Sequence, residues 1–301
     1  MCRMNPRVDF AFKKLFGSEE NKDILLPFLN AVLPPHDQIV SLELKNPYNL
    51  KDYEDDKLSI LDIRAVDNQG RHITIEMQIS NHLDYEKRAL FCWSDVYAKQ
   101  LGQGDSYTKL KKTIGIHVLN FNLLDEEPYH NIYKVKNLYS NALAFDHFQL
   151  HTIELKKFTT DMTHLKTALD RWTTFLIRAN ELSKNNIPTA LSSEPGLSKA
   201  ISVLETISLD RDERQRYEDQ LKALRDQESV IRTAQILGEE MGEKRGEKRG
   251  EKRGEKRGLE KGRIEAESKM VKNMSQSGVS IDQISQFTGL SVDHIQNLIQ
   301  N

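Results

Sequence analysis

The chain has 301 residues, of which 38% are hydrophobic and 29% charged, and its formal net charge is −2 at pH 7. This length suits one core of roughly 150 to 250 residues with an appendage. The near-neutral charge excludes a chain-wide basic field for nucleic acid, although it leaves room for a local one. The two cysteines, Cys2 and Cys92, exclude a disulfide framework and indicate a reducing compartment, so we expect a cytoplasmic protein. The start has no apolar signal core and no run of about 18 apolar residues follows, so we expect neither export nor membrane insertion.

The elements of the first half predict a mixed α/β fold. Apolar residues recur at helical spacing on both sides of a break at Gly17, and Pro34 stops the second helix. Three strands rich in β-branched residues, then a helix, then a fourth strand follow, at 39–48, 58–66, 71–79, 84–101 and 112–121. The order is therefore α-β-β-β-α-β.

The rest of the chain predicts three regions. Further edge strands are expected at 131–139 and 150–155, and helices at 162–182 and from 197 to about 224 close the domain. We place the main domain at 1–225, a charged repeat at 226–270 that is either a helix or a linker, and a small helix-turn-helix-like tail at 271–301.

The repeat carries a glycine at every fourth position from Gly238 to Gly262, separated mostly by Glu-Lys-Arg. Each glycine costs a helix about 1 kcal/mol relative to alanine, so an isolated helix should not persist here. Three interpretations stay open: a close-packed dimer helix, a basic arm and a solvated, partly disordered linker. The energetics favour the linker.

The tail predicts a helix, a turn at Gly289 and a second helix, with Ser280 and Gln283 forming a capping box. This shape resembles a DNA-reading motif, but residues 273–301 contain no lysine or arginine to contact phosphates. We therefore favour a module for packing or oligomerisation, and expect a homo-oligomer, such as a dimer, through the C-terminal region.

The segment LDIRAVDNQGRHITIEMQIS places two acids in strand-like runs. Its glycine predicts a three-residue hairpin loop that ends at a left-handed Gly70. Asp67 then pairs with Arg71, and counting back sets Asp62 directly opposite Glu76.

Two carboxylates so placed repel each other, because the Cβ atoms of opposed residues lie about 4.5 to 5.5 Å apart. A divalent cation with hard oxygen ligands, Mg²⁺ or Mn²⁺, would resolve the conflict. The alternative is an ordinary solvated acidic face.

The whole arrangement resembles the PD-(D/E)XK nuclease superfamily. Asp62, the Glu76-Met77-Gln78 triplet, the flanking helix and the order of elements carry the resemblance. Within the superfamily, the chain resembles the Rpn family of recombination-promoting nucleases and transposases, through DFAFKKLFG, the hairpin, YEKRALFCWSDVYAKQLGQGDSYTKLKKTIGIHVLNF and the glycine-rich repeat. The resemblance implies a restriction-endonuclease-like core.

Carried over residue by residue, the resemblance implies that Asp62 and Glu76 bind the metal, together with the Met77 carbonyl. Asp9 matches an acid that some members supply from the first helix, although an acid at a helix start also has an ordinary explanation. Gln78 stands where the superfamily has a lysine, and an amide orients water without supplying positive charge.

Several basic residues are candidates for DNA contact. Lys87 and Arg88, on the helix after the hairpin, would replace the missing positive charge, or they are surface cations. A patch near Tyr107 either holds a DNA backbone or is a solvated strand entry; it consists of Lys109, Lys111 and Lys112.

These features lead to a Mg²⁺-dependent DNA endonuclease that promotes recombination or transposition-like exchange. The alternative is a noncatalytic DNA-binding or regulatory oligomer that keeps the nuclease fold. A third interpretation is a scaffold that assembles through its glycine-rich tail.

Overall fold

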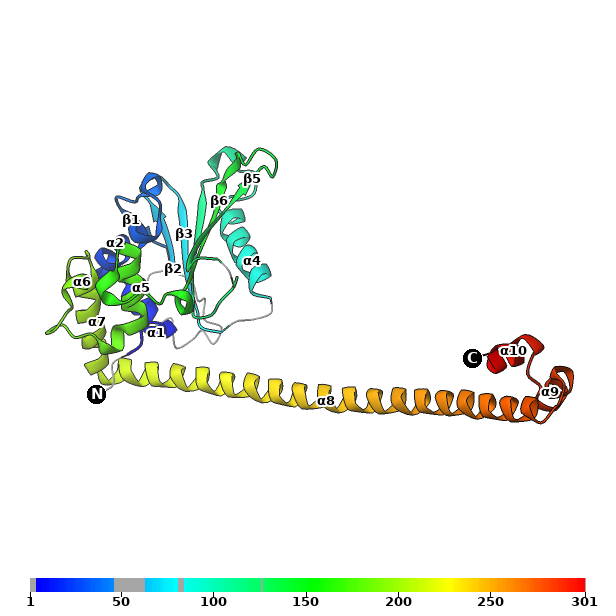
Figure 1. The fold of residues 1–301 in the computed structure, drawn as a ribbon. Helices are drawn as coiled ribbons and strands as arrows, with labels where there is room; N and C mark the ends of the chain where they lie inside the picture. Colours follow the sequence, from blue (N-terminus) through cyan, green and yellow to red (C-terminus); the bar gives the residue numbers. More distant parts are fainter. Residues whose placement is uncertain (1–3, 46–62, 81–83, 126, 301) are drawn as a thin grey trace. The chain divides into compact units, whose positions relative to one another are not determined.

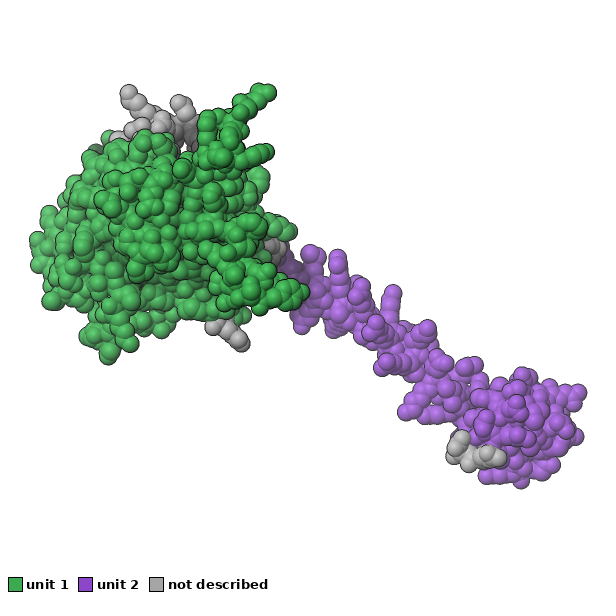
Figure 2. Space-filling model, turned by 90° about the horizontal axis from the view of Figure 1, so that it is seen from above, with its two compact units in different colours: residues 1–224 green, residues 225–301 purple. Residues whose placement is uncertain are grey.

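The computed structural model describes residues 4–45, 63–80, 84–125 and 127–300. Its contacts divide the chain into two compact units, residues 1–224 and 225–301 (Figure 2). No helix of the described chain is both long and apolar enough to cross a membrane.

The first unit is built around a six-stranded mixed sheet with the order β1-β2-β3-β4-β6-β5. Its strands are β1 Leu42–Leu44, β2 Ile63–Asp67, β3 His72–Gln78, β4 Thr113–Leu119, β5 His130–Lys136 and β6 Leu143–Glu154. β3 and β6 both run parallel to β4, and the other neighbours are antiparallel. The predicted mixed α/β fold is confirmed.

Helices lie on both faces of this sheet (Figure 1). One face is covered by α1 Asp9–Phe16, α2 Lys22–Val32, α5 Ala168–Arg178, α6 Thr189–Ser192 and α7 Leu197–Leu209, and the other by α4 Tyr85–Ala98. Short 3-10 helices join these elements at Glu19–Asn21, Pro35–Asp37, Tyr107–Lys109, Leu155–Lys157, Met162–His164 and Ala179–Glu181.

The main core fills the space between the sheet and the first group of helices. The odd-numbered residues Ile73, Ile75 and Met77 of β3 point into it. Phe16, Phe28 and Trp172 meet there, with ring centroids 4.9 to 6.0 Å apart. The alternate residues of β3 consequently face α4, where a smaller apolar cluster includes Tyr85, Leu119 and Phe121.

The hairpin between β2 and β3 has the predicted register in every pair that the structure describes. Ile63 lies opposite Ile75, and the loop ends at Gly70 with φ 77°. Arg71 locks the loop, because its Nε lies 2.5 Å from Asp67 Oδ2 and its Nη1 lies 2.9 Å from Asp37 Oδ1. Buried ion pairs of this kind need several partners to offset desolvation, and Arg71 has them.

The position of β6 differs from the expectation of an additional edge strand. β6 lies inside the sheet between β4 and β5, and only β5 is at the edge. Its last six residues run from Gln149 to Glu154. Five of them are fully buried and the sixth, Leu150, is 8% exposed, so this half of β6 is an interior strand. The alternation of polar and apolar residues in LHTIEL concealed this burial.

One helix, α8 Arg211–Gln276, contains the whole charged repeat. The expectation that the repeat is a partly disordered linker is therefore wrong. Helix nucleation is the costly step, and both ends of α8 are nucleated by packing. At its start Glu213 pairs with Lys14 at 2.9 Å, and near its end Val271 is fully buried.

The second unit ends in α9 Ile281–Thr288 and α10 Val292–Gln300. Val271, Ile284 and Ile295 form its small core. The predicted capping box is present, since Ser280 Oγ accepts from the Gln283 backbone N–H at 3.4 Å and the Gln283 side chain accepts from the Ser280 N–H. Gly289 ends α9 with φ 73°.

Candidate functional site

Glu76 lies on β3, on the face that α4 covers, and its exposed fraction is only 3%. In sheet register it is followed by His117 on β4 and Thr152 on β6. Side chains in register on adjacent strands point to the same face about 4.8 Å apart. The three residues therefore form a buried polar row across the centre of the sheet.

Tyr85, the first residue of α4, contacts this row from the helix. Its hydroxyl lies 2.9 Å from His117 Nδ1, and His117 Nδ1 lies 4.0 Å from Glu76 Oε2. Burial lowers the pKa of His117 to about 4, with the Arg88 charge adding to the effect. Burial also raises the pKa of Tyr85, and the negative charge of Glu76 raises it further. At neutral pH the histidine is uncharged and the tyrosine keeps its proton.

The other two residues of the predicted triplet lie beside Glu76 but differ in direction. Met77 turns its side chain into the main core, at 5% exposure. The Gln78 carbonyl accepts from the Asn120 N–H on the β4 side, so the Met77 carbonyl faces the β2 side of the strand. The Gln78 side chain is buried, and its Nε2 donates to the Ser80 carbonyl at 3.1 Å.

Asp62, the second predicted metal ligand, lies outside the described residues. Within the described part of the chain, no group of three or more histidine, cysteine, aspartate or glutamate side chains is arranged to hold a metal ion. The donors that are described still suit a hard cation, because a buried carboxylate and a backbone carbonyl are oxygen ligands. Glu76 and the Met77 carbonyl fit Mg²⁺ or Mn²⁺ by this chemistry.

Asp9 is the first residue of α1, and Lys13 and Gln220 lie close to its carboxylate. Lys13 Nζ lies 3.2 Å from Asp9 Oδ2, and Gln220 Nε2 lies 3.5 Å from the same oxygen. Arg7, two residues earlier, donates to Asn120 Oδ1 at 2.9 Å. Asn120 also bonds Gln78, so the segment leading into α1 is attached to the end of β3 that carries Gln78.

The predicted basic residues separate into two groups. Lys87 and Arg88 follow Tyr85 on α4; Lys87 is exposed and pairs with Asp84 at 2.8 Å, while Arg88 is half-buried and close enough to lower the pKa of His117. The other group precedes β4 and consists of Lys109, Lys111 and Lys112.

That second group lies at the opposite end of β3 from Gln78. The Lys112 carbonyl accepts from the His72 N–H, and four residues of strand, about 13 Å, separate His72 from Glu76. Lys109 is paired with Asp105, and Lys112 pairs with Asp146 at 3.2 Å. The structure therefore does not bring these lysines to Glu76.

Tyr85 and His117 are functional candidates that the sequence did not reveal. His117 is a lone polar residue in the apolar strand GIHVL, and its period-two position assigns it to the face of Gly115 and Leu119. The sequence therefore marks His117 as unusual. It does not show that β4 pairs in parallel with β3, which is what makes His117 a neighbour of Glu76.

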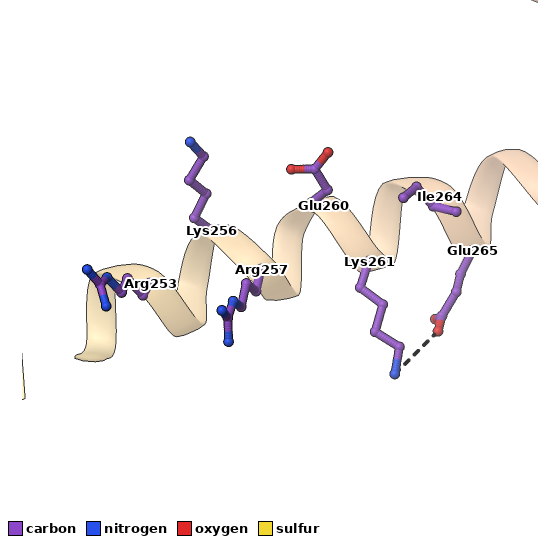
Figure 3. A pocket seen from close by; sticks show the side chains of 7 residues that line it. All are labelled: Arg253, Lys256, Arg257, Glu260, Lys261, Ile264 and Glu265. Carbon is purple, nitrogen blue, oxygen red and sulfur yellow. Dashed lines mark ion pairs between the residues drawn. The ribbon is translucent and has the colours of Figure 1, made fainter. Parts of the chain in front are cut away.

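A second surface rich in charges runs along the repeat (Figure 3). All the side chains on it are exposed and belong to α8, so it is an open helix surface and not an enclosed pocket. Lys261 Nζ lies 3.8 Å from Glu265 Oε1. The residues are Arg253, Lys256, Arg257, Glu260, Lys261, Ile264 and Glu265.

Comparison with known proteins agrees with the geometry around β3. A family model described as PD-(D/E)XK nuclease family transposase matches residues 6–234. Searches of curated proteins and of solved structures found no match. The family implies a nuclease, a hydrolase whose substrate is DNA, and its members generally use divalent metals. The resemblance seen in the hairpin is confirmed, and the chain belongs to the PD-(D/E)XK nuclease family transposases.

Proposed function

We propose that the protein is a Mg²⁺-dependent endonuclease that hydrolyses phosphodiester bonds in DNA and promotes recombination or transposition-like exchange. The observation that carries the proposal is the buried Glu76 carboxylate on β3, in a hairpin with the predicted register. A carboxylate at this depth is costly unless cations or donors stabilise it. The family membership supplies the reaction class.

In this proposal Asp62, Glu76 and the Met77 carbonyl hold the metal, and Mn²⁺ would also fit. When bound, the ion polarises a phosphoryl oxygen and lowers the pKa of a water molecule. The amide of Gln78 is the water-orienting group, anchored through its bond to the Ser80 carbonyl. Asp9 is a further candidate acid.

DNA would approach from the start of α4, because Lys87 and Arg88 lie there beside Tyr85. Their charges would offset part of the phosphate charge. Lys109, Lys111 and Lys112 remain candidates only for a backbone contact at the other end of the sheet.

Plasmid nicking with Mg²⁺, Mn²⁺ or EDTA tests the reaction. We expect Glu76→Ala and Asp62→Ala to lower the metal-dependent rate at least about 100-fold, because each removes a ligand to the ion that stabilises transition-state charge. Glu43→Ala, which removes an exposed acid on β1, is the matched control and should cut like wild type. Nicking that survives both ligand changes would exclude this site.

A noncatalytic DNA-binding or regulatory oligomer is the second candidate, and Gln78 favours it. Its neutral amide replaces the lysine of the superfamily and so weakens phosphate stabilisation. Mn²⁺ binding that depends on Glu76, without cleavage of any DNA, would support this candidate over the endonuclease.

We also propose that the chain self-associates through its C-terminal region. Val230, Ala234, Leu237 and Met241 recur on α8 at the four-and-three spacing of a coiled-coil seam. Val230 is 69% exposed, Leu237 52% and Met241 57%. A second copy carries the identical seam, so a paired helix would bury both. We further propose a cytoplasmic location, on the basis of the cysteine usage.

A further inference from the structure

The contact between α4 and β4 is a buried tyrosine–histidine pair next to the proposed metal ligand. The Tyr85 and His117 rings meet edge to face, with centroids 5.9 Å apart and planes at 78°. Tyr85 is 5% exposed and His117 2% exposed, so neither ring is free to turn into solvent. Phe121 also meets Tyr85 edge to face, with ring centroids 5.5 Å apart.

A buried hydrogen bond between the two side chains restrains the imidazole. The Tyr85 hydroxyl oxygen and His117 Nδ1 lie 2.9 Å apart. Together with the edge-to-face ring contact, this bond fixes the rotation of the His117 ring, whichever of the two atoms donates.

The fixed ring lies against the Glu76 carboxylate. His117 Nδ1 is 4.0 Å from Glu76 Oε2, and the two residues are in register on adjacent parallel strands. A rotation of the imidazole would change which ring atom faces that carboxylate oxygen. The orientation of Glu76 is thus coupled, through His117, to a hydroxyl on another element.

We propose that Tyr85 is a positioning residue which, through His117, holds the Glu76 carboxylate in the orientation that binds a divalent cation. This inference rests on the proposed nuclease function of the same site. Removal of a residue that orients a metal ligand without touching the metal commonly lowers metal affinity about 10- to 100-fold. Tyr85 and His117 would not touch the ion or the DNA themselves.

The same helix offers a matched control for Tyr85. Tyr97 OH lies 2.9 Å from His147 Nδ1, and these rings also meet edge to face, with centroids 5.9 Å apart. This second hydrogen bond is exposed, and Tyr97 lies twelve residues, about 18 Å, further along α4 than Tyr85. Tyr97→Phe removes a bond of the same type and length at a site remote from Glu76.

Mn²⁺ binding by calorimetry on the full chain, run beside plasmid nicking and thermal unfolding, tests the inference. We expect Tyr85→Phe to weaken Mn²⁺ binding about tenfold or more and to raise the Mn²⁺ concentration for half-maximal nicking equally. Tyr97→Phe should bind Mn²⁺ like wild type. The Tm of Tyr85→Phe should fall by only a few degrees, because one buried polar group loses its partner while the fold is kept. Equal Mn²⁺ affinity in the two phenylalanine variants would refute the positioning role.

Two substitutions at His117 separate positioning from simple packing. An asparagine amide oxygen occupies the place of Nδ1 and can accept from Tyr85, so His117→Asn should retain much of the Mn²⁺ affinity. His117→Leu fills the space without an acceptor and should lose as much affinity as Tyr85→Phe. If the leucine variant binds as tightly as the asparagine variant, the hydrogen bond does no positioning.

Mn²⁺ binding and DNA cutting by the wild-type protein distinguish loss of the metal site from loss of the positioning role. Wild-type protein that neither binds Mn²⁺ nor cuts DNA refutes both. Wild-type protein that depends on Glu76 for Mn²⁺ binding, but tolerates Tyr85→Phe, keeps the metal site and refutes only the positioning role.

Discussion

His151 is a second buried histidine with a strongly altered pKa, on the face of β6 that carries Ile153. It is fully buried, its Nδ1 lies 3.0 Å from His130 Nε2, and its Nε2 lies 2.7 Å from the Gln149 amide nitrogen. The amide donates, so Nε2 accepts and Nδ1 carries the proton toward His130. Burial, and then the neighbouring His130, lower the pKa of His151 to about 3.

We expect this histidine to destabilise the fold in acid. Its pKa is 6.5 in the unfolded chain and about 3 in the folded one, so below pH 6.5 the unfolded state binds the proton that the folded state refuses. His151 therefore leaves the free energy of unfolding unchanged above pH 6.5 and lowers it progressively as the pH drops toward 3. At pH 5 the loss from this group is about 2 kcal/mol.

Urea unfolding at pH 7.5 and pH 5 measures that loss. His151→Gln keeps a polar amide but cannot take up a proton, so its unfolding free energy should fall about 2 kcal/mol less between the two pH values than that of wild type. The exposed His36 gives the control, His36→Gln. A pH dependence unchanged by His151→Gln would contradict the expectation.

At the residue scale, sequence reasoning located the carboxylate but not its surroundings. Glu76 was identifiable because an acid in an apolar strand is rare and a turn fixed its register. Tyr85 and His117 were not, because their meeting with Glu76 depends on how α4 crosses from β3 to β4. Lys112 lies close to other candidates in sequence, but strand direction takes it to the far end of the sheet.

At the element scale, the helix with the glycine repeat should gain stability from alanine. Gly246 and Gly250 lie in α8, and a Cβ at either position meets nothing within 4 Å. Each replacement should stabilise the helix by about 1 kcal/mol, because alanine loses less backbone entropy. The Gly246→Ala/Gly250→Ala double variant should raise the temperature at which the circular dichroism signal at 222 nm is lost.

At a third glycine of the same unit, replacement by alanine should lower stability. A Cβ added at Gly289 would also meet nothing within 4 Å, but the φ of Gly289 is 73°, in the left-handed region. Gly289→Ala should therefore destabilise the tail by about 1 kcal/mol. Equal effects at Gly289 and Gly246 would show that backbone conformation does not control these positions.

The elements themselves were largely predictable, whereas their neighbours were not. Capping signals and apolar spacing identified α1, α2, α9 and the hairpin, since these are local features. The helical state of the repeat was missed because local energetics oppose it and packing at the ends of α8 supports it. β6 was predicted at the edge because its pairing with β4 and β5 depends on the order of strands in the sheet, which local sequence patterns do not show.

At the scale of the whole molecule, the seam on α8 predicts a dimer. Val230→Glu with Leu237→Glu puts two charges into the seam, so we expect the mass measured by light scattering to fall from dimer to monomer. Ile236→Glu is the control, because Ile236 is 49% exposed but lies on another side of the helix. A mass that the double variant leaves unchanged would exclude this seam as the interface.

The seven repeat glycines are surrounded by open space, and the Lys and Arg side chains between them are solvated. The packing of the two cores consequently does not depend on how many tetrads the helix contains. We expect an in-frame gain or loss of one Gly-Glu-Lys-Arg unit to leave the packing of both cores unchanged. The number of tetrads can therefore change without repacking either core.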